Sequence, residues 1–389
     1  MSDPVPDRVA VVGAGVAGLT VMQELRRLGY AGRLTVVGAE RHLPYDRPML
    51  SKQVLLGEWP VERAYLTTPG EWEALGIERW HAEPAVGLDL ARRVVRLGDG
   101  GEVEADAVVV ASGCRPRIPD FARDQPAVRV LRSIDDCLRL RDALAAQPRV
   151  AVVGGGFLGL ELASAARTVG AHVELITRTL LLERVLPPEL SAELGAMHVE
   201  QGTVMRYGVD VSRLAASADG AASTLHLSNG EVIDADLVVA AVGAEPNLEW
   251  LSGSGLEIAD GIECDEGGRV AEGIYCCGDV AAWWSPAWRR RMRFEHRVAA
   301  FEQASVVARN LLGERANWTS LPFWWSDQAG ARLQGYGLTS TELEFRTHSG
   351  SIGERRFVGV YLDRGSVVGV VGLNSPKELR QARQLIDIH

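Results

Sequence analysis

The chain has 389 residues, of which 47% are apolar and 24% charged, and its net charge at pH 7 is −10. This length predicts about two or three domains, and the composition excludes a disordered chain and a coiled coil. The negative charge argues against nucleic-acid binding, because phosphates would be repelled. No apolar run approaches the length of about 18 residues that a transmembrane helix needs. No secretory signal is visible, so we expect a cytoplasmic protein without a membrane segment.

The cysteine pattern argues against thiol redox chemistry and against a metal site. The five cysteines are Cys114, Cys137, Cys264, Cys276 and Cys277. None forms a C-x-x-C or C-x-x-x-x-C pair, so a redox centre of the disulfide-reductase kind is not expected. No group of Cys and His has the spacing of a zinc site. Adjacent cysteines rarely form a disulfide, so Cys276 and Cys277 are interpreted as small core residues.

An internal repeat is the most informative feature of the sequence. The apolar run 8–12 is typical of a buried parallel strand. It continues into Gly13-Ala-Gly15-Val-Ala-Gly18, a helix to about residue 28 and a second strand at 34–37. The same order recurs from residue 149, with strands expected at 149–153 and 173–176 and a second turn, Gly154-Gly-Gly156-Phe-Leu-Gly159. The stretch 106–116 closes the first unit, and the similar stretch 236–246 closes the second. The repeat predicts two nucleotide-binding domains of one architecture.

Both glycine turns have the context that a dinucleotide requires. A lone G-x-G-x-x-G is weak, but each match here follows a strand and opens a helix. The first glycine makes the turn, the second lets the backbone approach a pyrophosphate, and the third allows the helix to pack on the strand. The pyrophosphate then lies on the positive helix N-terminus. Two such units in one chain indicate hydride transfer between a nicotinamide and a flavin.

We therefore predict an α/β fold with two Rossmann-like dinucleotide-binding domains and a small α+β C-terminal domain. The expected divisions are 1–112 with 244–316 for a discontinuous FAD domain, 113–243 for an NAD(P)H domain and 317–389 for the C-terminal domain. Other expected elements are strands near 273–277, 357–361 and 366–370, a long helix near 297–312 and a closing helix from about Pro376.

At this point the sequence resembles a known family, the FAD-dependent ferredoxin reductases that serve bacterial haem monooxygenases and Rieske dioxygenases (the putidaredoxin reductase group). The stretches that carry the resemblance span the chain: 11–18, 43–52, 154–161, 275–280, 323–328 and 373–377. The most specific are Pro48-Met-Leu-Ser-Lys52 and Trp325-Ser-Asp-Gln328. The resemblance implies a fold like that of glutathione reductase, with FAD, NAD(P)H and a ferredoxin partner.

The resemblance also implies which residues hold the FAD. They are Gly13, Gly15, Ala17, Gly18, Glu40, Arg47, Lys52, Arg132, Gly278, Asp279, Arg297 and Trp325. Glu40 is the candidate partner of the adenosine ribose, and Asp279 matches an acid that binds the ribityl chain. Arg297 departs from the aromatic or aliphatic residue of relatives. The N-terminus of helix 297–312 would point at the flavin pyrimidine, where its positive field favours the anionic reduced flavin.

For the nicotinamide nucleotide the resemblance implies Gly154, Gly156, Gly159, Glu161, Thr177, Arg178, Arg184 and Gly243. Many NADH-using relatives carry an acid at the end of the second strand, where it binds the ribose hydroxyls. Here that position is Thr177, followed by Arg178 and, six residues further, Arg184. Loss of an acid and gain of arginine favour a 2′-phosphate, so NADPH is slightly favoured over NADH.

Lys52, Glu161 and Trp325 are the candidate catalytic residues. With 2 Lys against 39 Arg in the chain, Lys52 indicates a place for a compact ammonium group. In the family this lysine pairs with the residue at Glu161 beside the flavin. The alternatives are a surface lysine and a carboxylate that only favours the helix dipole. Trp325 is expected to cover the flavin and conduct electrons, whereas Trp324 is expected in the core.

Alternatives remain for the partner and for the function. The run Arg289-Arg290-Arg291-Met292-Arg293 is either a solvated loop or a dock for an acidic ferredoxin. The same flavin site would suit direct reduction of a small molecule, such as a quinone, a nitro compound, oxygen or a biosynthetic intermediate. A third possibility is a nucleotide-sensing protein like apoptosis-inducing factor. The protein is expected to be a monomer or a homodimer.

Overall fold

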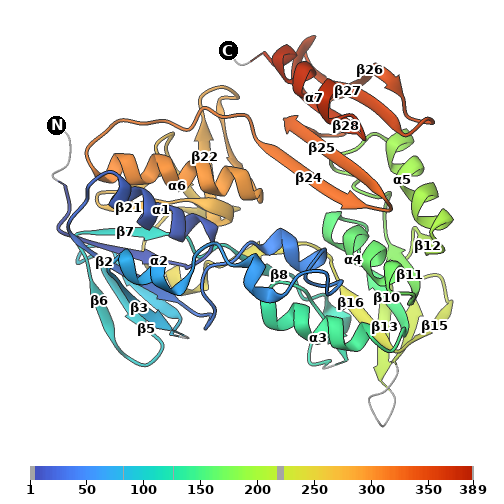
Figure 1. The fold of residues 1–389 in the computed structure, drawn as a ribbon, viewed down its shortest axis with the longest axis horizontal. Helices are drawn as coiled ribbons and strands as arrows, with labels where there is room; N and C mark the ends of the chain where they lie inside the picture. Colours follow the sequence, from blue (N-terminus) through green and yellow to red (C-terminus); the bar gives the residue numbers. More distant parts are fainter. Residues whose placement is uncertain (1–4, 82, 126, 217–222, 388–389) are drawn as a thin grey trace.

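A computed structural model describes residues 5–81, 83–125, 127–216 and 223–387. The chain is arranged around three large sheets, which Figure 1 shows as distinct blocks. The first two sheets contain the two repeat units, and the third lies in the C-terminal part. The predicted α/β fold with two Rossmann-like units and a C-terminal α+β part is confirmed.

The first sheet has six strands in the order β20–β21–β7–β1–β2–β3, and every pair except the antiparallel β20–β21 edge is parallel. Its strands are β1 (Arg8–Val12), β2 (Arg33–Gly38), β3 (Ile77–His81), β7 (Ala107–Val110), β20 (Arg269–Ala271) and β21 (Ile274–Cys276). Helix α1 (Val16–Arg27) joins β1 to β2 and packs against α6 (Arg297–Leu311). The first unit is therefore completed by residues that follow the second unit in the chain.

The second sheet repeats this plan with five parallel strands in the order β12–β11–β10–β16–β9. They are β9 (Val128–Arg129), β10 (Arg149–Val153), β11 (His172–Thr177), β12 (Val204–Tyr207) and β16 (Leu237–Ala240), with helices α3 (Ile134–Leu144), α4 (Phe157–Thr168) and α5 (Pro188–Glu200). The repeat extends to a side-chain pair at the start of each unit. Arg8 lies 2.9 Å from Asp106, and Arg149 lies 2.6 Å from Asp236.

Smaller elements complete the two units. The short sheets comprise β4 (Ala85–Asp89), β5 (Val94–Leu97) and β6 (Glu102–Glu104); β13 (Val211–Ala216), β14 (Ser223–Leu227) and β15 (Val232–Ala235); and β18 (Ile258–Ala259), β19 (Gly261–Cys264), β22 (Ala281–Ser285) and β23 (Arg290–Arg293). The short helices are α2 (Pro69–Ala74), η1 (Arg47–Ser51), η2 (Val61–Ala64), η3 (Asp120–Ala122), η4 (Glu249–Leu251) and η5 (Gly278–Val280). An antiparallel ribbon of β8 (Cys114–Pro116) and β17 (Ala244–Pro246) connects the units where the chain leaves the first and returns to it.

The third sheet is antiparallel, in the order β24–β25–β28–β27–β26. Its strands are β24 (Phe323–Gln328), β25 (Ala331–Gly337), β26 (Glu344–Ser351), β27 (Arg356–Asp363) and β28 (Ser366–Leu373). The closing helix α7 (Pro376–Ala382), followed by η6 (Arg383–Leu385), packs Leu379 on this sheet. Strand β24 contacts α4, so the third sheet leans on the second unit. The exact domain divisions stay a prediction.

Burial agrees with the interpretation of the cysteines. All five are free and buried, and Cys276 and Cys277 are fully enclosed. Both are therefore small core residues, as predicted. None of the helices in the described ranges is both long and apolar enough to cross a membrane.

The two glycine turns have the same geometry. Gly13 and Gly154 adopt φ of 112° and 122°, which only glycine adopts easily. A Cβ on Gly159 would lie 2.0 Å from the carbonyl oxygen of Gly154, so helix and turn touch at that point. A Cβ on Gly156 would meet no atom of the described residues within 4 Å. The second glycine of the turn thus borders open space.

Gly159→Ala is expected to lower the free energy of unfolding by about 1–3 kcal/mol, because the new methyl group collides with a backbone oxygen that cannot rotate away. Urea denaturation followed by circular dichroism measures this loss. Gly156→Ala is the matched control and should not be destabilised. Equal midpoints for the two variants would contradict the observed packing.

Candidate functional site

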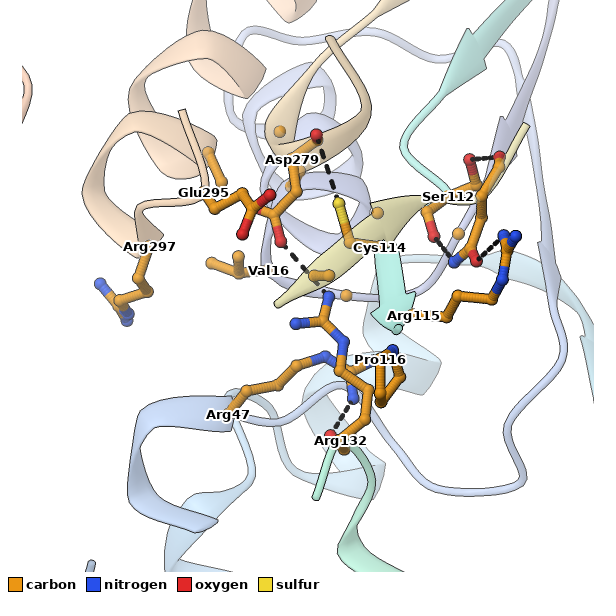
Figure 2. A pocket seen from close by; sticks show the side chains of 18 of the residues that line it. Val16, Arg47, Ser112, Cys114, Arg115, Pro116, Arg132, Asp279, Glu295 and Arg297 are labelled. Carbon is orange, nitrogen blue, oxygen red and sulfur yellow. Dashed lines mark hydrogen bonds and ion pairs between the residues drawn. The ribbon is translucent and has the colours of Figure 1, made fainter. Parts of the chain in front are cut away.

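A cavity of about 1160 Å³ lies between the two units and strand β24. It exceeds the roughly 300–1,000 Å³ of ordinary small-molecule sites, so it has room for an extended ligand. Its lining includes the first turns of α1, α4 and α6, the η1 segment and the aromatic start of β24. Figure 2 shows side chains from both repeat units and from the α6 region around this space.

The three helices that begin at the cavity lack caps of their own. Within the described chain, α1, α4 and α6 have no capping side chain and no acidic residue in the first turn. By contrast, α2 and α3 are capped by boxes built on Thr68 and Ser133. Uncapped N–H groups and the helix dipole make each of the three N-termini positive. The cavity is therefore suited to anionic ligands such as a pyrophosphate.

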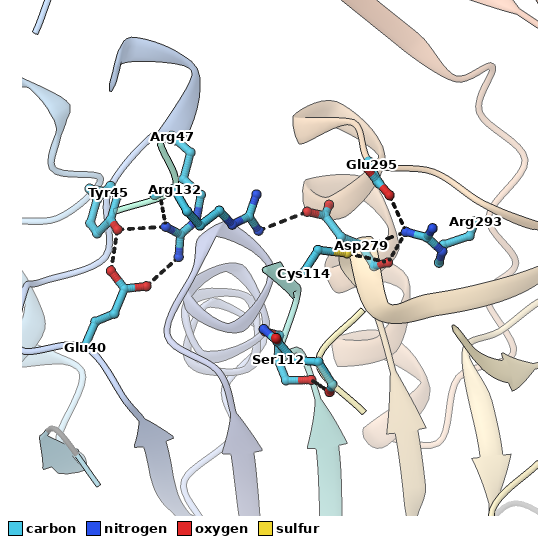
Figure 3. A network of polar contacts seen from close by, with 10 residues as sticks. Glu40, Tyr45, Arg47, Ser112, Cys114, Arg132, Asp279, Arg293 and Glu295 are labelled. Atoms are coloured by element: carbon cyan, nitrogen blue, oxygen red, sulfur yellow. Dashed lines mark hydrogen bonds and ion pairs between the residues drawn. The ribbon is translucent and has the colours of Figure 1, made fainter. Parts of the chain in front are cut away.

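Four residues that the sequence analysis predicts to bind FAD lie in one polar network, which Figure 3 shows: Glu40, Arg47, Arg132 and Asp279. Arg47 Nη2 lies 2.6 Å from Glu40 Oε1, and Arg47 Nη1 donates to the carbonyl oxygen of Arg132 at 2.6 Å. Arg132 Nη2 lies 3.3 Å from Asp279 Oδ2. Burial alone would raise the pKa of Glu40, but the charge of Arg47 and the Tyr45 hydroxyl outweigh it and hold that pKa below its usual value.

The other predicted FAD residues border the same cavity. Gly13, Gly15, Ala17 and Gly278 line it, but Gly18 packs behind the turn. Arg297 Nε lies 2.9 Å from Asp46 Oδ1, so its charge is balanced by a residue that the sequence analysis did not single out. Gly278 adopts φ of 76° and donates its N–H to the buried Gln303 at 2.9 Å.

Two buried donors at the cavity have no hydrogen-bond partner among the described residues. They are Arg132 Nε and Trp250 Nε1. Both atoms are shielded from solvent, so each carries the cost of an unsatisfied buried donor. Sequence reasoning missed Trp250, because a tryptophan between two turns carries no motif.

Lys52 and Glu161 form a buried ion pair, as the resemblance implied. Lys52 Nζ lies 2.6 Å from Glu161 Oε2, and both side chains are at most 9% exposed. The surface-lysine alternative for Lys52 is therefore wrong. The carboxylate also accepts hydrogen bonds from Ser51 Oγ at 2.5 Å and Ser326 Oγ at 2.7 Å, neither of which was predicted. Glu161 is thus fixed by three donors at the wall of the cavity.

The three aromatic residues of β24 all border the cavity but differ in burial. Trp324 is buried and its Nε1 donates to Thr339 Oγ1 at 3.2 Å, which confirms a core position. Trp325 is half-buried, lines the cavity and stacks on Phe323 with ring centroids 5.9 Å apart. Phe323 in turn contacts Tyr336 at 4.6 Å. An aromatic row therefore leads from the cavity along β24 and β25.

The predicted nicotinamide residues are brought together only in part. Gly156, Glu161 and Gly243 line the cavity, and Gly154 and Gly159 form the turn behind it. Within the described chain, Thr177, Arg178 and Arg184 do not belong to the lining. Thr177 is buried beside the turn and bonds to the backbone of Thr179. Arg178 and Arg184 are exposed, with Arg178 Nε 3.9 Å from Asp210.

The arginine run lies on the β22–β23 hairpin, and two of its four arginines have ion-pair partners among the described residues. Arg291 lies 3.1 Å from Glu263, and Arg293 contacts both Asp260 and Glu295. Arg289 and Arg290 are exposed. Its use as a dock stays a prediction.

Two strand–turn–helix units that open onto one cavity define an oxidoreductase fold of the two-dinucleotide class. The chain belongs to the pyridine nucleotide-disulphide oxidoreductase family, whose model matches residues 7–304. A second model, described as reductase C-terminal, matches residues 323–389.

Similar proteins cover almost the whole chain. The ferredoxin–NAD(+) reductase subunit of the benzene 1,2-dioxygenase system of Pseudomonas putida is 34% identical over 385 residues, which are 98% of this chain and 92% of the relative. Putidaredoxin reductase of Pseudomonas putida is 34% identical over 387 residues, with the same coverage of 98% and 92%. A crystal structure of the covalent putidaredoxin reductase–putidaredoxin complex matches with a TM-score of 0.93 at 33% identity, covering 98% of this chain and 93% of that one. These comparisons confirm the family resemblance.

Lys52→Met is expected to lower the free energy of unfolding by about 3 kcal/mol, because a buried carboxylate loses its counter-charge but keeps its two serine donors. Urea denaturation measures the loss. The double variant Lys52→Met/Glu161→Leu should recover most of it, since no unpaired charge remains. Additive losses in the double variant would contradict a coupled ion pair.

Proposed function

We propose that the protein is a flavoprotein reductase that takes a hydride from NAD(P)H and passes single electrons to a ferredoxin serving an oxygenase in the cytoplasm. The observation that carries the proposal is a single cavity shared by two uncapped glycine-turn helices, with the Lys52–Glu161 pair in its wall. The ferredoxin partner is supported by relatives that match 98% of the chain.

The residues present fit FAD, which when bound supplies a ring that accepts a hydride and releases electrons singly. The N–H groups at the start of α1 bind the pyrophosphate where Gly15 leaves open space. Glu40 is kept ionised by Arg47 and would accept hydrogen bonds from the ribose hydroxyls. Asp279, which lines the same cavity, would do the same for the ribityl chain.

On the other side of the cavity, Glu161 and Lys52 orient the nicotinamide. Hydride transfer depends on position more than on acid–base exchange, so rigidity of the binding wall matters. The ion pair is buried and its carboxylate is held by three donors, which gives that rigidity. The backbone at Gly156 and Gly243 completes the nucleotide-binding edge.

The five cysteines are free and buried, so none of them forms a disulfide that could accept electrons within the described chain. Burial raises the pKa of Cys114 to about 12 and that of Cys137 to about 11, and raises that of Cys276 and Cys277 still more strongly. Such thiols stay protonated and do not form reactive thiolates. We therefore infer that electrons leave towards the half-buried Trp325, Phe323 and Tyr336 row.

Adding a ferredoxin of the [2Fe–2S] class is expected to stimulate NAD(P)H-driven cytochrome c reduction strongly. Trp325→Ala should weaken that stimulation more than Trp284→Ala, because Trp284 lies on β22 outside the cavity lining of the described chain. No stimulation, with turnover of quinones or oxygen instead, would favour direct reduction of a small molecule. Very slow flavin reduction with a lasting charge-transfer band would favour nucleotide sensing.

We also propose that the nicotinamide half accepts NADPH, with some preference over NADH. Support comes from Thr177 in place of an acid and from the exposed Arg178 and Arg184. Two observations weigh against a strong preference. Arg178 is near Asp210, and the matched relatives are named as NAD(+) reductases.

Thr177→Asp is expected to lower kcat/KM for NADPH by about tenfold relative to NADH, since a carboxylate there repels a 2′-phosphate and binds ribose hydroxyls. Stopped-flow flavin reduction with each nucleotide gives the ratio, and Thr179→Ala serves as the neighbouring control. A wild-type NADPH/NADH ratio well below one would remove the proposed preference.

A further inference from the structure

A buried chain of hydrogen bonds leads from Glu161 to His198, away from the cavity. Ser326 Oγ donates to Glu161 Oε1 at 2.7 Å, and Gln328 Nε2 donates to Ser326 Oγ at 3.2 Å. Gln328 Oε1 lies 3.1 Å from His198 Nε2. The four side chains come from α4, β24 and α5, and all are at least nine-tenths buried. The chain therefore joins the second unit to the third sheet directly behind the cavity wall.

The charge of Glu161 sets the direction of every hydrogen bond in this chain. An ionised carboxylate only accepts, so Ser326 must donate its single hydroxyl proton to it. The Ser326 oxygen then accepts from the amide nitrogen of Gln328, which turns the amide oxygen of Gln328 towards His198. An amide oxygen only accepts, so His198 must carry its proton on Nε2.

The surroundings of His198 agree with a neutral ring. Burial lowers its pKa, so it is uncharged near pH 7. Its Nδ1 is buried and has no hydrogen-bond partner in the described part of the chain. A proton on Nδ1 would leave a buried donor unsatisfied, so the local environment also favours the Nε2–H tautomer.

We propose that His198 is a positioning residue for the nicotinamide reaction, which acts on Glu161 through Gln328 and Ser326. The inference rests on the proposed function only for the role of Glu161 at the nicotinamide. His198 donates to the Gln328 amide oxygen and so fixes the orientation of that amide. In this orientation Gln328 donates to Ser326, and the Ser326 hydroxyl proton remains directed at Glu161. The carboxylate then keeps the rotamer in which its other oxygen contacts Lys52.

The coupling between Glu161 and His198 can be tested without any turnover. Long-range ¹H–¹⁵N NMR of the holoprotein should show His198 as the Nε2–H tautomer, with the signal assigned by its loss in His198→Gln. In Glu161→Gln the new amide presents its oxygen to Lys52 and its nitrogen to Ser326. The Ser326 hydroxyl then donates to the side-chain oxygen of Gln328, so the Gln328 amide flips and points its nitrogen at His198. His198 Nε2 must then accept, and the ring is expected to shift towards the Nδ1–H tautomer. Ser326→Ala cuts the chain, so adding Glu161→Gln to it should leave the Nε2–H tautomer unchanged.

Flavin reduction tests the effect on the reaction. His198→Leu removes the donor to Gln328, and the limiting rate of reduction by NAD(P)H should fall about tenfold while the nucleotide Kd changes by less than about twofold. His198→Gln keeps an N–H at a similar reach and should restore the rate. Ser191→Ala is the matched control, because Ser191 lies one heptad earlier on α5, is equally buried and has no partner within the described residues.

Several outcomes would overturn the proposal. They are an Nδ1–H or protonated His198 in the wild type, a tautomer unchanged in Glu161→Gln, the same tautomer shift from Glu161→Gln with and without Ser326→Ala, and a loss of rate in Ser191→Ala equal to that in His198→Leu. Failure of the proposed function itself would look different. The tautomer would still respond to Glu161→Gln, but NAD(P)H would not reduce the wild-type flavin.

Discussion

The structure depends on keeping one carboxylate ionised inside the protein. Glu161 is 7% exposed, and a buried charge is stable only when counter-charge and hydrogen bonds replace water. The compensating groups do not come from its own helix. Ser51 reaches it from the last position of η1, Lys52 from the residue that follows η1, and Ser326 from β24. Compensating the buried charge of Glu161 therefore requires the first unit, the second unit and the third sheet to meet at the cavity wall.

The helix ends show a related choice between stability and binding. Capping boxes on α2 and α3 satisfy their first N–H groups internally. The helices α1, α4 and α6 forgo that stabilisation, as far as the described residues show, and leave their positive ends to the cavity. The helices α5 and α7 also lack a capping side chain, so what distinguishes α1, α4 and α6 is their position at the cavity. An anionic ligand bound there would offset the loss of about 1 kcal/mol that each missing cap represents.

Local sequence patterns predicted the fold well, but they did not predict the long-range contacts. Apolar runs and the two glycine turns located β1, α1, β10 and α4, because their causes lie within a few residues. The Lys52–Glu161 pair came from family resemblance, since the two residues are 109 positions apart. Ser51 and Ser326 lie within the two most specific family stretches and His198 lies in no motif, but the contacts of all three arise only when three segments pack together. The same holds for Asp46, whose charge offsets the unusual Arg297.

The ribbon of β8 and β17 has a consequence for how the protein is made. The chain leaves the first unit at β8 and returns through β17, so β21 and α6 reach the first sheet last. During synthesis the inserted second unit emerges whole while its predecessor still lacks an edge of its sheet and a covering helix. The nascent first unit therefore keeps apolar surface uncovered until β21 and α6 have been synthesised, whereas the strands of the second sheet, all within 128–240, are available before them.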